Sequence, residues 1–331
     1  MKACVYHRYG GPEVVEIRDL PTPVPQPGEL LIRIHASTVS AGDWRMRSLA
    51  MPRGFAPFAR LAIGITGPRQ PILGGDFAGI VAAIGAGVTR FAPGDAVFGF
   101  PGIKLGCHAQ YRVLAETGSV LPKPATLDFD AAASLPFGAM TALHYLRKAA
   151  IRPADRVVVV GASGAVGSAL VQLALHSGAE VTAVASTPNL GLVTSLGAHH
   201  AIDYTTTDVT AGPAEYDIIA DTVGATPFSR YRRILRPGGR LLAIAAGLPD
   251  MLAALWAPLY GRRVIVGPAS EALDDLRQIA SLAEQGALRP VIDRHYDMSD
   301  IAAAHAYVAT GRKRGSVVVR IERGDCDNPP R

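Results

Sequence analysis

The sequence predicts an α/β protein in which a doubly wound parallel sheet is inserted into a smaller β-rich domain. Three observations lead to this prediction. Short apolar runs separated by Gly and Pro fill the first third of the chain, and strand-like and helix-like segments alternate from Asp155 onward. After this alternation the chain continues with two further helices and a strand. A length of 331 residues suits two domains.

The β-rich domain is predicted from runs such as ELLIRIHAST, FAGIVAAIG and AVFGF, whose spacing is typical of short antiparallel strands. The segment between Ala50 and Gln70 is too apolar for a fully exposed loop. We interpret it as a segment packed against the domain, and a lid or short helix over a cleft is the alternative.

The pattern becomes helical after Pro122, in FDAAASLPFGAMTALHYLRKAA. Strands follow in RVVVVGA, EVTAVAS, HAIDY, DIIADTV, RLLAIAA and RVIVGPA, with helices between them. The tail then offers helices from about Asp274 to Gln285 and from about Ser299 to Thr310, and a last strand, SVVVRI. Because the inserted sheet already has its strands, we assign residues 1–122 and 271–331 to one domain and 123–270 to the other.

The formal charge of +5 is spread thinly along the chain, and we expect no nucleic-acid partner. Arg262-Arg263 and Arg312-Lys313-Arg314 are two dense basic runs. Solvated loops are the simpler interpretation of both, and contact with a cofactor phosphate is the alternative.

Three cysteines, Cys4, Cys107 and Cys326, lie far apart and form no CxxC pair, which favours a reducing compartment. No run approaches the roughly 20 apolar residues that a membrane span needs, and the first residues lack a leader pattern. We therefore expect a cytoplasmic protein without a membrane partner.

The strongest motif is VVVVGASGAVGSALVQLA, where a buried strand turns directly into a helix. Within it, Ala162-x-Gly164-x-x-Gly167 matches the dinucleotide fingerprint of a Rossmann domain. Gly164 lets the backbone approach a pyrophosphate, and Gly167 lets the helix pack on the strand. The amides of a helix start favour an anion. The predicted cofactor contacts in this loop are Ala162, Ser163, Gly164, Ala165, Val166 and Gly167.

About 20 residues later, NAD-specific proteins carry an acid that binds the adenosine 2′-hydroxyl. This chain has Ser186, Thr187 and Asn189 there instead, and the two hydroxyls could donate to a 2′-phosphate. The sequence therefore predicts NADPH. Pro188 stands where a basic residue would help, so the predicted preference over NADH is modest. At the carboxyl ends of later strands, where such sheets bind ligands, we predict nicotinamide-ribose contacts from Val223, Gly224, Ala245, Ala246 and Gly247.

Several motifs in the same order identify a family resemblance. ILGGDFAGIVAAIGAGVTRFAPGDAVFGF, the loop GASGAVGSALVQLA, STPNLGLVTSLGAHHAIDY and the closing GALRPVIDRHYDMSDIAAAHAYVATGRKRGSVVVRI resemble zinc-independent quinone oxidoreductase-like members of the medium-chain dehydrogenase/reductase family. The resemblance implies a GroES-like catalytic domain built from both chain ends, a central Rossmann domain and a homodimer. It also places Tyr204 over the adenine side of the cofactor, with a partly buried core tyrosine as the alternative. Arg314 is expected to reach the cofactor or the mouth of the substrate cleft.

The resemblance also allows the metal to be judged residue by residue. Zinc-dependent relatives have Cys and His where this chain has Ser40 and Gly75, and neither replacement is a good Zn²⁺ ligand. The structural zinc lobe with its four cysteines is missing as well. We therefore predict a protein without metal.

Without metal, the negative charge that hydride transfer builds on a carbonyl oxygen must be stabilised otherwise. A quinone or an α,β-unsaturated carbonyl spreads this charge by conjugation, so we predict reduction of such substrates. The resemblance implies that the segments of Ser40 and Thr141 lie near the nicotinamide, which makes these two hydroxyls the candidate hydrogen-bond donors. Asp43 either orients a neighbouring group or caps a short helix, and capping is the simpler role. Two other functions stay open: an NADPH-binding sensor or RNA-associated protein with little turnover, and a trans-acting enoyl reductase. The latter is disfavoured because no Tyr follows Thr38 in the first catalytic motif.

Overall fold

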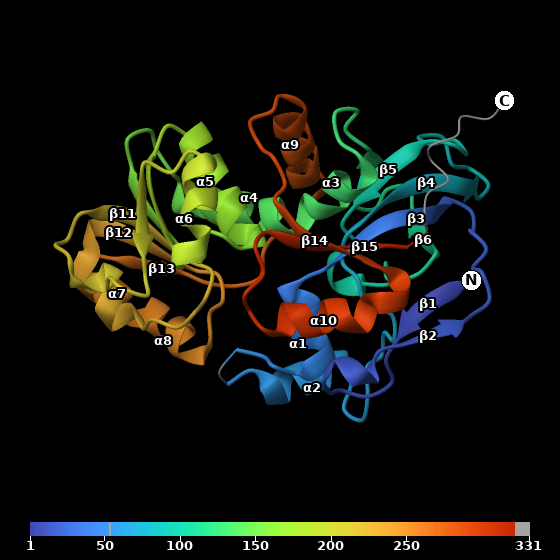
Figure 1. The fold of residues 1–331 in the computed structure, drawn as a ribbon, viewed down its shortest axis with the longest axis horizontal. Helices are drawn as coiled ribbons and strands as arrows, with labels where there is room; N and C mark the ends of the chain where they lie inside the picture. The colour runs from blue at the N-terminus through green and yellow to red at the C-terminus, as the bar shows by residue number, and fades with distance from the viewer. Residues whose placement is uncertain (53, 322–331) are drawn as a thin grey trace.

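The computed structural model describes residues 1–52 and 54–321, and their strands form three sheets (Figure 1). A six-stranded parallel sheet lies in one half of the molecule and a seven-stranded mixed sheet in the other. A two-stranded sheet of β1 (Lys2–Val5) and β2 (Glu16–Asp19) lies beside the mixed sheet. The predicted fold class, a Rossmann-type sheet combined with a β-rich GroES-like domain, is confirmed.

The parallel sheet has the strand order β10-β9-β8-β11-β12-β13. The order reverses between β8 and β11, which is where doubly wound sheets bind ligands at the carboxyl ends of their strands. Its strands are β8 (Arg156–Val160), β9 (Glu180–Ala185), β10 (His200–Asp203), β11 (Tyr216–Asp221), β12 (Leu235–Ala243) and β13 (Arg263–Ile265). The connecting helices are α5 (Ala165–His176), α6 (Leu190–Ser195), α7 (Phe228–Ile234) and α8 (Leu248–Trp256).

The mixed sheet has the order β14-β15-β3-β4-β5-β7, and β6 also pairs with β3. Its strands are β3 (Glu29–Val39), β4 (Phe77–Ile84), β5 (Ala96–Gly99), β6 (Tyr111–Ala115), β7 (Val120–Pro122), β14 (Ile292–Asp297) and β15 (Ser316–Arg320). The C-terminal strands β14 and β15 thus pair with the strands of the first third of the chain, although the parallel sheet lies between them in the sequence. The predicted limits between the two domains stay a proposal.

Helices connect the two halves. The predicted helix after Pro122 forms two, α3 (Phe129–Ser134) and α4 (Pro136–Ala149), because Pro136 can begin a helix but cannot continue one. α4 packs against α5 and against α9 (Leu273–Glu284), and all three contribute to a core that also contains side chains of both large sheets. α10 (Ile301–Ala309) packs with α1 (Ala41–Ser48) on the other side of the mixed sheet.

For the segment between Ala50 and Gln70, the preferred interpretation of packing against the domain was wrong, whereas the short helix of the alternative is present. The apolar segment between Ala50 and Gln70 forms α2 (Ala56–Ile63), and none of the helix residues is buried. Phe58 and Leu61 are exposed instead of packed against the domain.

Candidate functional site

The turn between β8 and α5 has the geometry of a phosphate-binding loop. Gly161 has a φ of +76°, and a Cβ at this position would lie 2.4 Å from Oγ1 of Thr222. The turn therefore requires glycine at position 161, a requirement that the sequence motif beginning at Ala162 did not identify. The amides of Gly161 and Ala162 both donate to the carbonyl oxygen of Val184, which fixes the loop to β9.

Two glycines of the motif play different roles. A Cβ at Gly167 would lie 2.1 Å from the carbonyl oxygen of Gly161, so glycine is needed for α5 to pack on the strand. A Cβ at Gly164 would meet only the Gly161 oxygen, at 3.5 Å, an ordinary contact. The fold itself therefore does not require glycine at position 164. Gly164 is the N-cap of α5 and offers no side chain to cap it, so the amides of Ala165 and Val166 are available to an anion.

A small polar cluster joins the phosphate loop to the end of β9. Nδ2 of Asn189 donates to Oγ of Ser163 at 3.2 Å and to Oγ of Ser186 at 3.1 Å. Oδ1 of Asn189 is buried and accepts no hydrogen bond from the described residues. A buried amide oxygen without a donor is costly, and it is an acceptor that a ribose hydroxyl group could satisfy. Three residues predicted to bind the cofactor are therefore brought together.

The structure also places a carboxylate in this region that the sequence analysis missed. Asp203 ends β10 and pairs in register with Ala185 at the end of β9. Its carboxylate accepts hydrogen bonds from the hydroxyl of Thr187 and from the amide and hydroxyl of Thr205, which lower the pKa of Asp203. The hydroxyl proton of Thr187 is thus directed to a carboxylate rather than kept for a phosphate. The parallel alternation of strands could have revealed Asp203, because adjacent strands end at the same edge.

The loops after β11 and β12 lie against each other at the same edge. Gly224 has a φ of +75°, and a Cβ there would lie 2.8 Å from the carbonyl oxygen of Ala245. The amides of Val223 and Gly224 donate to the buried carboxylate of Asp221, and burial raises its pKa. Gly247 is the N-cap of α8, and its amide donates to Asp250. The predicted residues Val223, Gly224, Ala245, Ala246 and Gly247 therefore lie in loops at the same edge of the parallel sheet as the phosphate loop.

The last loop before β15 touches the phosphate loop through its backbone. The amide of Gly315 donates to the carbonyl oxygen of Ser163 at 2.7 Å, and Gly164 forms a parallel bridge with Gly315. Nζ of Lys313 donates to the Gly315 oxygen at 2.5 Å. The side chain of Arg314 is exposed, and its amide bonds Asp293. The basic residue next to the phosphate loop is therefore Lys313, which we had interpreted as part of a solvated loop.

A buried carboxylate, Asp76, ties the two halves together directly before β4. One of its oxygens accepts the hydroxyl of Thr38 at 2.6 Å, and the other accepts the amide of Phe137 in the first turn of α4 at 3.0 Å. Burial raises the pKa of Asp76 to about 7, although the two hydrogen bonds and the charge of Lys313 act in the opposite direction. Burial also lowers the pKa of Lys313 to about 8.

The predicted catalytic side chains are engaged with each other and with the backbone. Ser40 is the N-cap of α1, and its hydroxyl donates to Asp43 at 2.6 Å, while the other oxygen of Asp43 accepts the amide of Gly74. Asp43 thus completes a capping box. The hydroxyl of Thr141 donates to the carbonyl oxygen of Phe137 one turn earlier. The proposed hydroxyl donors already have acceptors in this structure, and their roles toward a substrate stay predictions.

The exposure of Tyr204 tests one further prediction, and two side chains of the first domain are buried. Tyr204 is 61% exposed at the rim beyond β10, so the alternative interpretation as a core tyrosine is wrong. Cys107 and His108 are both buried, and burial raises the pKa of the Cys107 thiol. Cys107 packs in the core beneath the mixed sheet rather than at an opening. Cys326 lies outside the described residues.

The side chains at the possible metal position do not form a ligand set. Within residues 1–52 and 54–321, no three His, Cys, Asp or Glu side chains are grouped so that they could hold a metal ion. Ser40 donates to Asp43, and Gly75 has no side chain. The carboxylates of Asp43 and Asp76 are occupied by hydrogen bonds from the protein. This set of donors does not fit Zn²⁺, which is bound by three or four His, Cys or carboxylate ligands.

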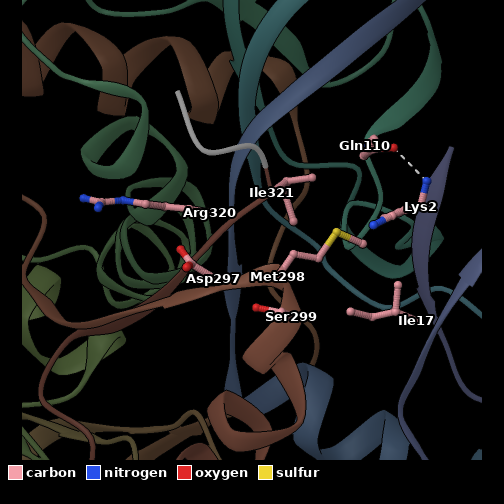
Figure 2. A pocket seen from close by; sticks show the side chains of 8 residues that line it. All are labelled: Lys2, Ile17, Gln110, Asp297, Met298, Ser299, Arg320 and Ile321. Carbon is pink, nitrogen blue, oxygen red and sulfur yellow. Dashed lines mark hydrogen bonds between the residues drawn. The ribbon is translucent and has the colours of Figure 1, made fainter. Parts of the chain in front are cut away.

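A hollow of about 430 Å³ lies elsewhere, on the outer side of the mixed sheet (Figure 2). Figure 2 shows the Lys2 amide hydrogen-bonded to Gln110 on one side and Asp297 and Arg320 on the other. Arg320 also pairs with Asp130. The lining combines the charged residues Lys2, Asp297 and Arg320 with the apolar side chains of Ile17, Met298 and Ile321. None of the predicted site residues lines this hollow, so it is separate from the phosphate loop.

Comparison with known proteins places the chain among dehydrogenases and reductases. Residues 26–125 match the family model described as alcohol dehydrogenase GroES-like domain, and residues 196–319 match the model described as zinc-binding dehydrogenase. The chain is 30% identical to the NADPH-dependent alkenal/one oxidoreductase of Arabidopsis thaliana, over 96% of this chain and 79% of that protein. It is 29% identical to the chloroplast envelope quinone oxidoreductase homolog of the same plant, over 96% and 98% of the two chains.

The fold is similar to that of solved structures of oxidoreductases. The quinone oxidoreductase from Coxiella burnetii superimposes with a TM-score of 0.87 at 28% identity, covering 97% of this chain and 99% of that one. No helix among the described residues combines the length and apolar character that crossing a membrane requires.

Proposed function

Because the chain belongs to the medium-chain dehydrogenase/reductase family and is an oxidoreductase with a nicotinamide cofactor, we propose that it reduces quinones or α,β-unsaturated carbonyl compounds with NADPH. The observation that carries the proposal is the phosphate loop. Gly164 is not required by the fold, yet it keeps the start of α5 open to an anion, directly beside the backbone of Gly315. The named activities of the Arabidopsis and Coxiella proteins support the same substrate classes.

The residues around the loop fit a dinucleotide. The amides of Ala165 and Val166 would hold the pyrophosphate, and Oδ1 of Asn189 would accept a ribose hydroxyl that replaces its missing donor. Val223 and Ala245 would border the nicotinamide ribose. A bound nicotinamide supplies the hydride that reduces the substrate.

Other residues of the chain hold α4 in place and offer hydrogen bonds to the substrate oxygen. Asp76 holds the start of α4 through the Phe137 amide and is itself bonded by Thr38 of β3, so α4 keeps a fixed position relative to β3. Ser40 and Thr141 are the proposed donors to the substrate oxygen. Rotating the hydroxyl away from its present acceptor costs about 1 kcal/mol for Thr141, which donates to a carbonyl, and about 1.5–3 kcal/mol for Ser40, which donates to a carboxylate. Lys313 places a positive charge next to Gly315.

We propose that this reduction proceeds without zinc. The support is chemical: Ser40 and Gly75 stand at the two ligand positions, and both nearby carboxylates are occupied by protein donors. A conjugated acceptor needs only hydrogen-bond donors to stabilise the enolate or hydroquinone oxygen. The same reasoning makes unconjugated alcohols poor substrates.

The choice of NADPH over NADH is supported by the hydroxyl of Ser186, which lies at the end of β9 with no carboxylate bonded to it among the described residues. Asp203 acts against this choice, because its carboxylate bonds the hydroxyl of Thr187 and would repel a 2′-phosphate. We therefore expect NADPH to be preferred by a small factor, consistent with the absence of a basic side chain at Pro188.

The direct test follows NADPH and NADH oxidation with a panel of quinones, alkenals and vinyl ketones, together with cofactor binding by fluorescence titration. Turnover of conjugated acceptors, with simple ketones and alcohols inert, is the expected result. Tight NADPH binding without turnover of any acceptor would contradict the reductase and favour a binding protein. Loss of activity on treatment with a chelator, restored by Zn²⁺, would contradict the zinc-free reaction.

A further inference from the structure

One face of α4 is only half-buried, although the helix runs through the middle of the molecule (Figure 1). Along residues 136–146, Phe137, Thr141 and His144 keep part of their surface exposed, whereas the other residues are buried. Their spacing of four and three residues places these three side chains on the same face of the helix. His144 therefore lies on the face of the proposed donor Thr141, about one turn further along.

The beginning of this face adjoins the residues proposed to act on the substrate. The ring of Phe137 lies 6.4 Å from that of Phe100, measured between centroids. Gly75, one of the two possible metal positions, is next to Phe100, because a Cβ on this glycine would lie 3.4 Å from Cε2 of the ring. A Cβ on Gly42 would lie 3.7 Å from Cε2 of Phe137 and 3.2 Å from Oγ of Ser40. Ser40 and the possible metal position are therefore neighbours of the first turn of α4.

The other end of the face is bordered by the loop that follows β13. The amide of Ser270 donates to Nδ1 of His144 at 3.2 Å. The carboxylate of the next residue, Glu271, accepts the amide of Ile103 at 3.1 Å. Residues 100–103 therefore border this face at its end as well as at its beginning.

The hydrogen bond from Ser270 fixes where His144 carries its proton. Because an amide N–H donates to Nδ1, this nitrogen has the lone pair, and a neutral ring then has its proton on Nε2. Burial lowers the pKa of His144, and the charges of Lys148 and Arg147 act in the same direction, against that of Asp275. At pH 7 the side chain is therefore a neutral ring with one N–H donor, at Nε2.

This donor is not used by the protein. Nε2 of His144 is buried and finds no hydrogen-bond acceptor among residues 1–52 and 54–321. A buried donor without an acceptor is unfavourable, and an oxygen atom of a ligand would remove this cost. Ser40 and Thr141 each have to break an existing hydrogen bond before they can donate to a ligand. His144 does not.

We propose that the Nε2–H group of His144 donates a hydrogen bond to the carbonyl oxygen of the substrate and stabilises the negative charge that develops there. The inference rests on the proposed function and adds a catalytic residue to it. A neutral imidazole suits this role, since it polarises a carbonyl group without first having to be charged. The same donor serves a quinone and an enone, because both develop charge on a carbonyl oxygen.

The balance of electrons and protons is that of a conjugate reduction. The β-carbon of an enone receives a hydride from the reduced nicotinamide and forms a new C–H bond. The π electrons of the C=C bond move toward the carbonyl group and give an enolate, whose oxygen accepts the hydrogen bond while the proton stays on Nε2 of His144. Water then supplies the proton for the α-carbon, and the products are the saturated ketone and the oxidised nicotinamide.

Two substitutions of His144 separate this role from a purely structural one. The side-chain oxygen of Asn lies where Nδ1 is, so H144N keeps the acceptor for the Ser270 amide and loses the donor. The side-chain nitrogen of Gln lies where Nε2 is, so H144Q keeps a donor and loses the acceptor. A residue that only holds the loop at Ser270 makes H144N the milder change, whereas a donor to substrate makes H144Q the milder one.

The measurement is the steady-state reduction of methyl vinyl ketone and of 1,4-benzoquinone with NADPH. We expect H144N to lower kcat about 100-fold, the usual effect of removing one donor from a developing oxyanion. KM for NADPH should change little, because the donor acts on the substrate. H144Q should keep kcat within about tenfold of the unchanged protein.

His200 offers a matched control. It is exposed on the edge strand β10 and pairs with Glu180. H200N and H200Q carry the same chemical changes and should leave kcat unchanged. All four variants should retain the circular dichroism spectrum of the unchanged protein.

A second measurement does not depend on activity. The ¹⁵N NMR spectrum of the histidine rings, with the signals of His144 assigned by their loss in H144Q, should show the proton on Nε2 in the unchanged protein. This measurement decides the tautomer even when H144N fails to fold.

Three results contradict the proposal: a proton on Nδ1 of His144, a normal kcat in H144N, and an H144Q variant as impaired as H144N. Each of them removes only the role of His144, provided that the unchanged protein reduces the two acceptors. An unchanged protein that reduces no conjugated acceptor contradicts the proposed function itself, and this inference fails with it.

Discussion

Replacing Asp76 with Asn should remove a pH dependence from the stability of the protein. The carboxyl is buried, and its pKa is raised from 3.8 to about 7 in the folded state. An Asn side chain has the same shape, its oxygen can accept the Phe137 amide and its NH₂ group can donate to the hydroxyl of Thr38. D76N therefore keeps the contacts and loses the titration.

The sign and size of the effect follow from linkage. Between pH 4 and pH 7 the folded protein holds a proton on Asp76 that the unfolded chain has released, so the free energy of unfolding falls as the pH rises through this window. Above pH 7 the loss is complete. A shift of about three units corresponds to about 4 kcal/mol, since each unit is 1.36 kcal/mol. Lys313 stays charged in both states below its pKa of about 8 and does not contribute there.

The assay is chemical denaturation of the unchanged protein and of D76N at several pH values from 4.5 to 8. The difference between their free energies of unfolding should change by several kcal/mol, always in the direction that disfavours the unchanged protein at higher pH. Infrared spectra should show a protonated carboxyl signal that disappears near pH 7 and is missing in D76N. A difference that is constant with pH would refute the assigned pKa and the burial argument behind it.

Three further predictions concern the phosphate loop and its surroundings. G164A should leave the melting temperature unchanged and weaken NADPH binding at least about tenfold in a fluorescence titration. G167A should lower the melting temperature, because its Cβ would lie 2.1 Å from a carbonyl oxygen. Equal effects of the two variants on stability would contradict the different roles assigned to these glycines. D203N should raise the ratio of kcat/KM for NADPH to that for NADH several-fold, since it removes a carboxylate near the proposed 2′-phosphate, and an unchanged ratio would remove Asp203 from the specificity argument. S40A should lower the free energy of unfolding by about 1 kcal/mol in denaturation experiments, because the N-cap of α1 is lost. A substrate reduction rate lowered well beyond the effect of this destabilisation would support Ser40 as a donor to substrate.

Much of the fold was predictable because it depends on local patterns. The Val-rich strand before Gly161 and the alternation after it determine a parallel sheet, and the tail beginning near Asp274 could be returned to the first sheet by counting strands. The division of the helix after Pro122 was missed because Ala and Leu continue the helical spacing across Pro136. The exposure of α2 was also missed, since an apolar segment predicts burial unless it has a partner outside the chain.

The candidate site was predictable where one segment forms it and not where distant segments meet. The loop from Ala162 to Gly167 is continuous in sequence, so its motif was readable. Asp203 approaches Thr187 because of strand register, and Lys313 approaches the loop because β15 starts beside Gly164. Both depend on pairing between strands, which composition and spacing within a segment do not specify.

The hydrogen bond from Gly315 to Ser163 limits how the molecule can open. It joins the returning chain to the phosphate loop at one end of the boundary between the two large sheets, at 2.7 Å. A clamshell motion that keeps this bond has to swing about it, so the contact between Leu248 and the segment before α2 can open while the contact at Gly315 stays closed. Cross-linking that contact should slow exchange of bulky ligands while leaving the loop itself intact.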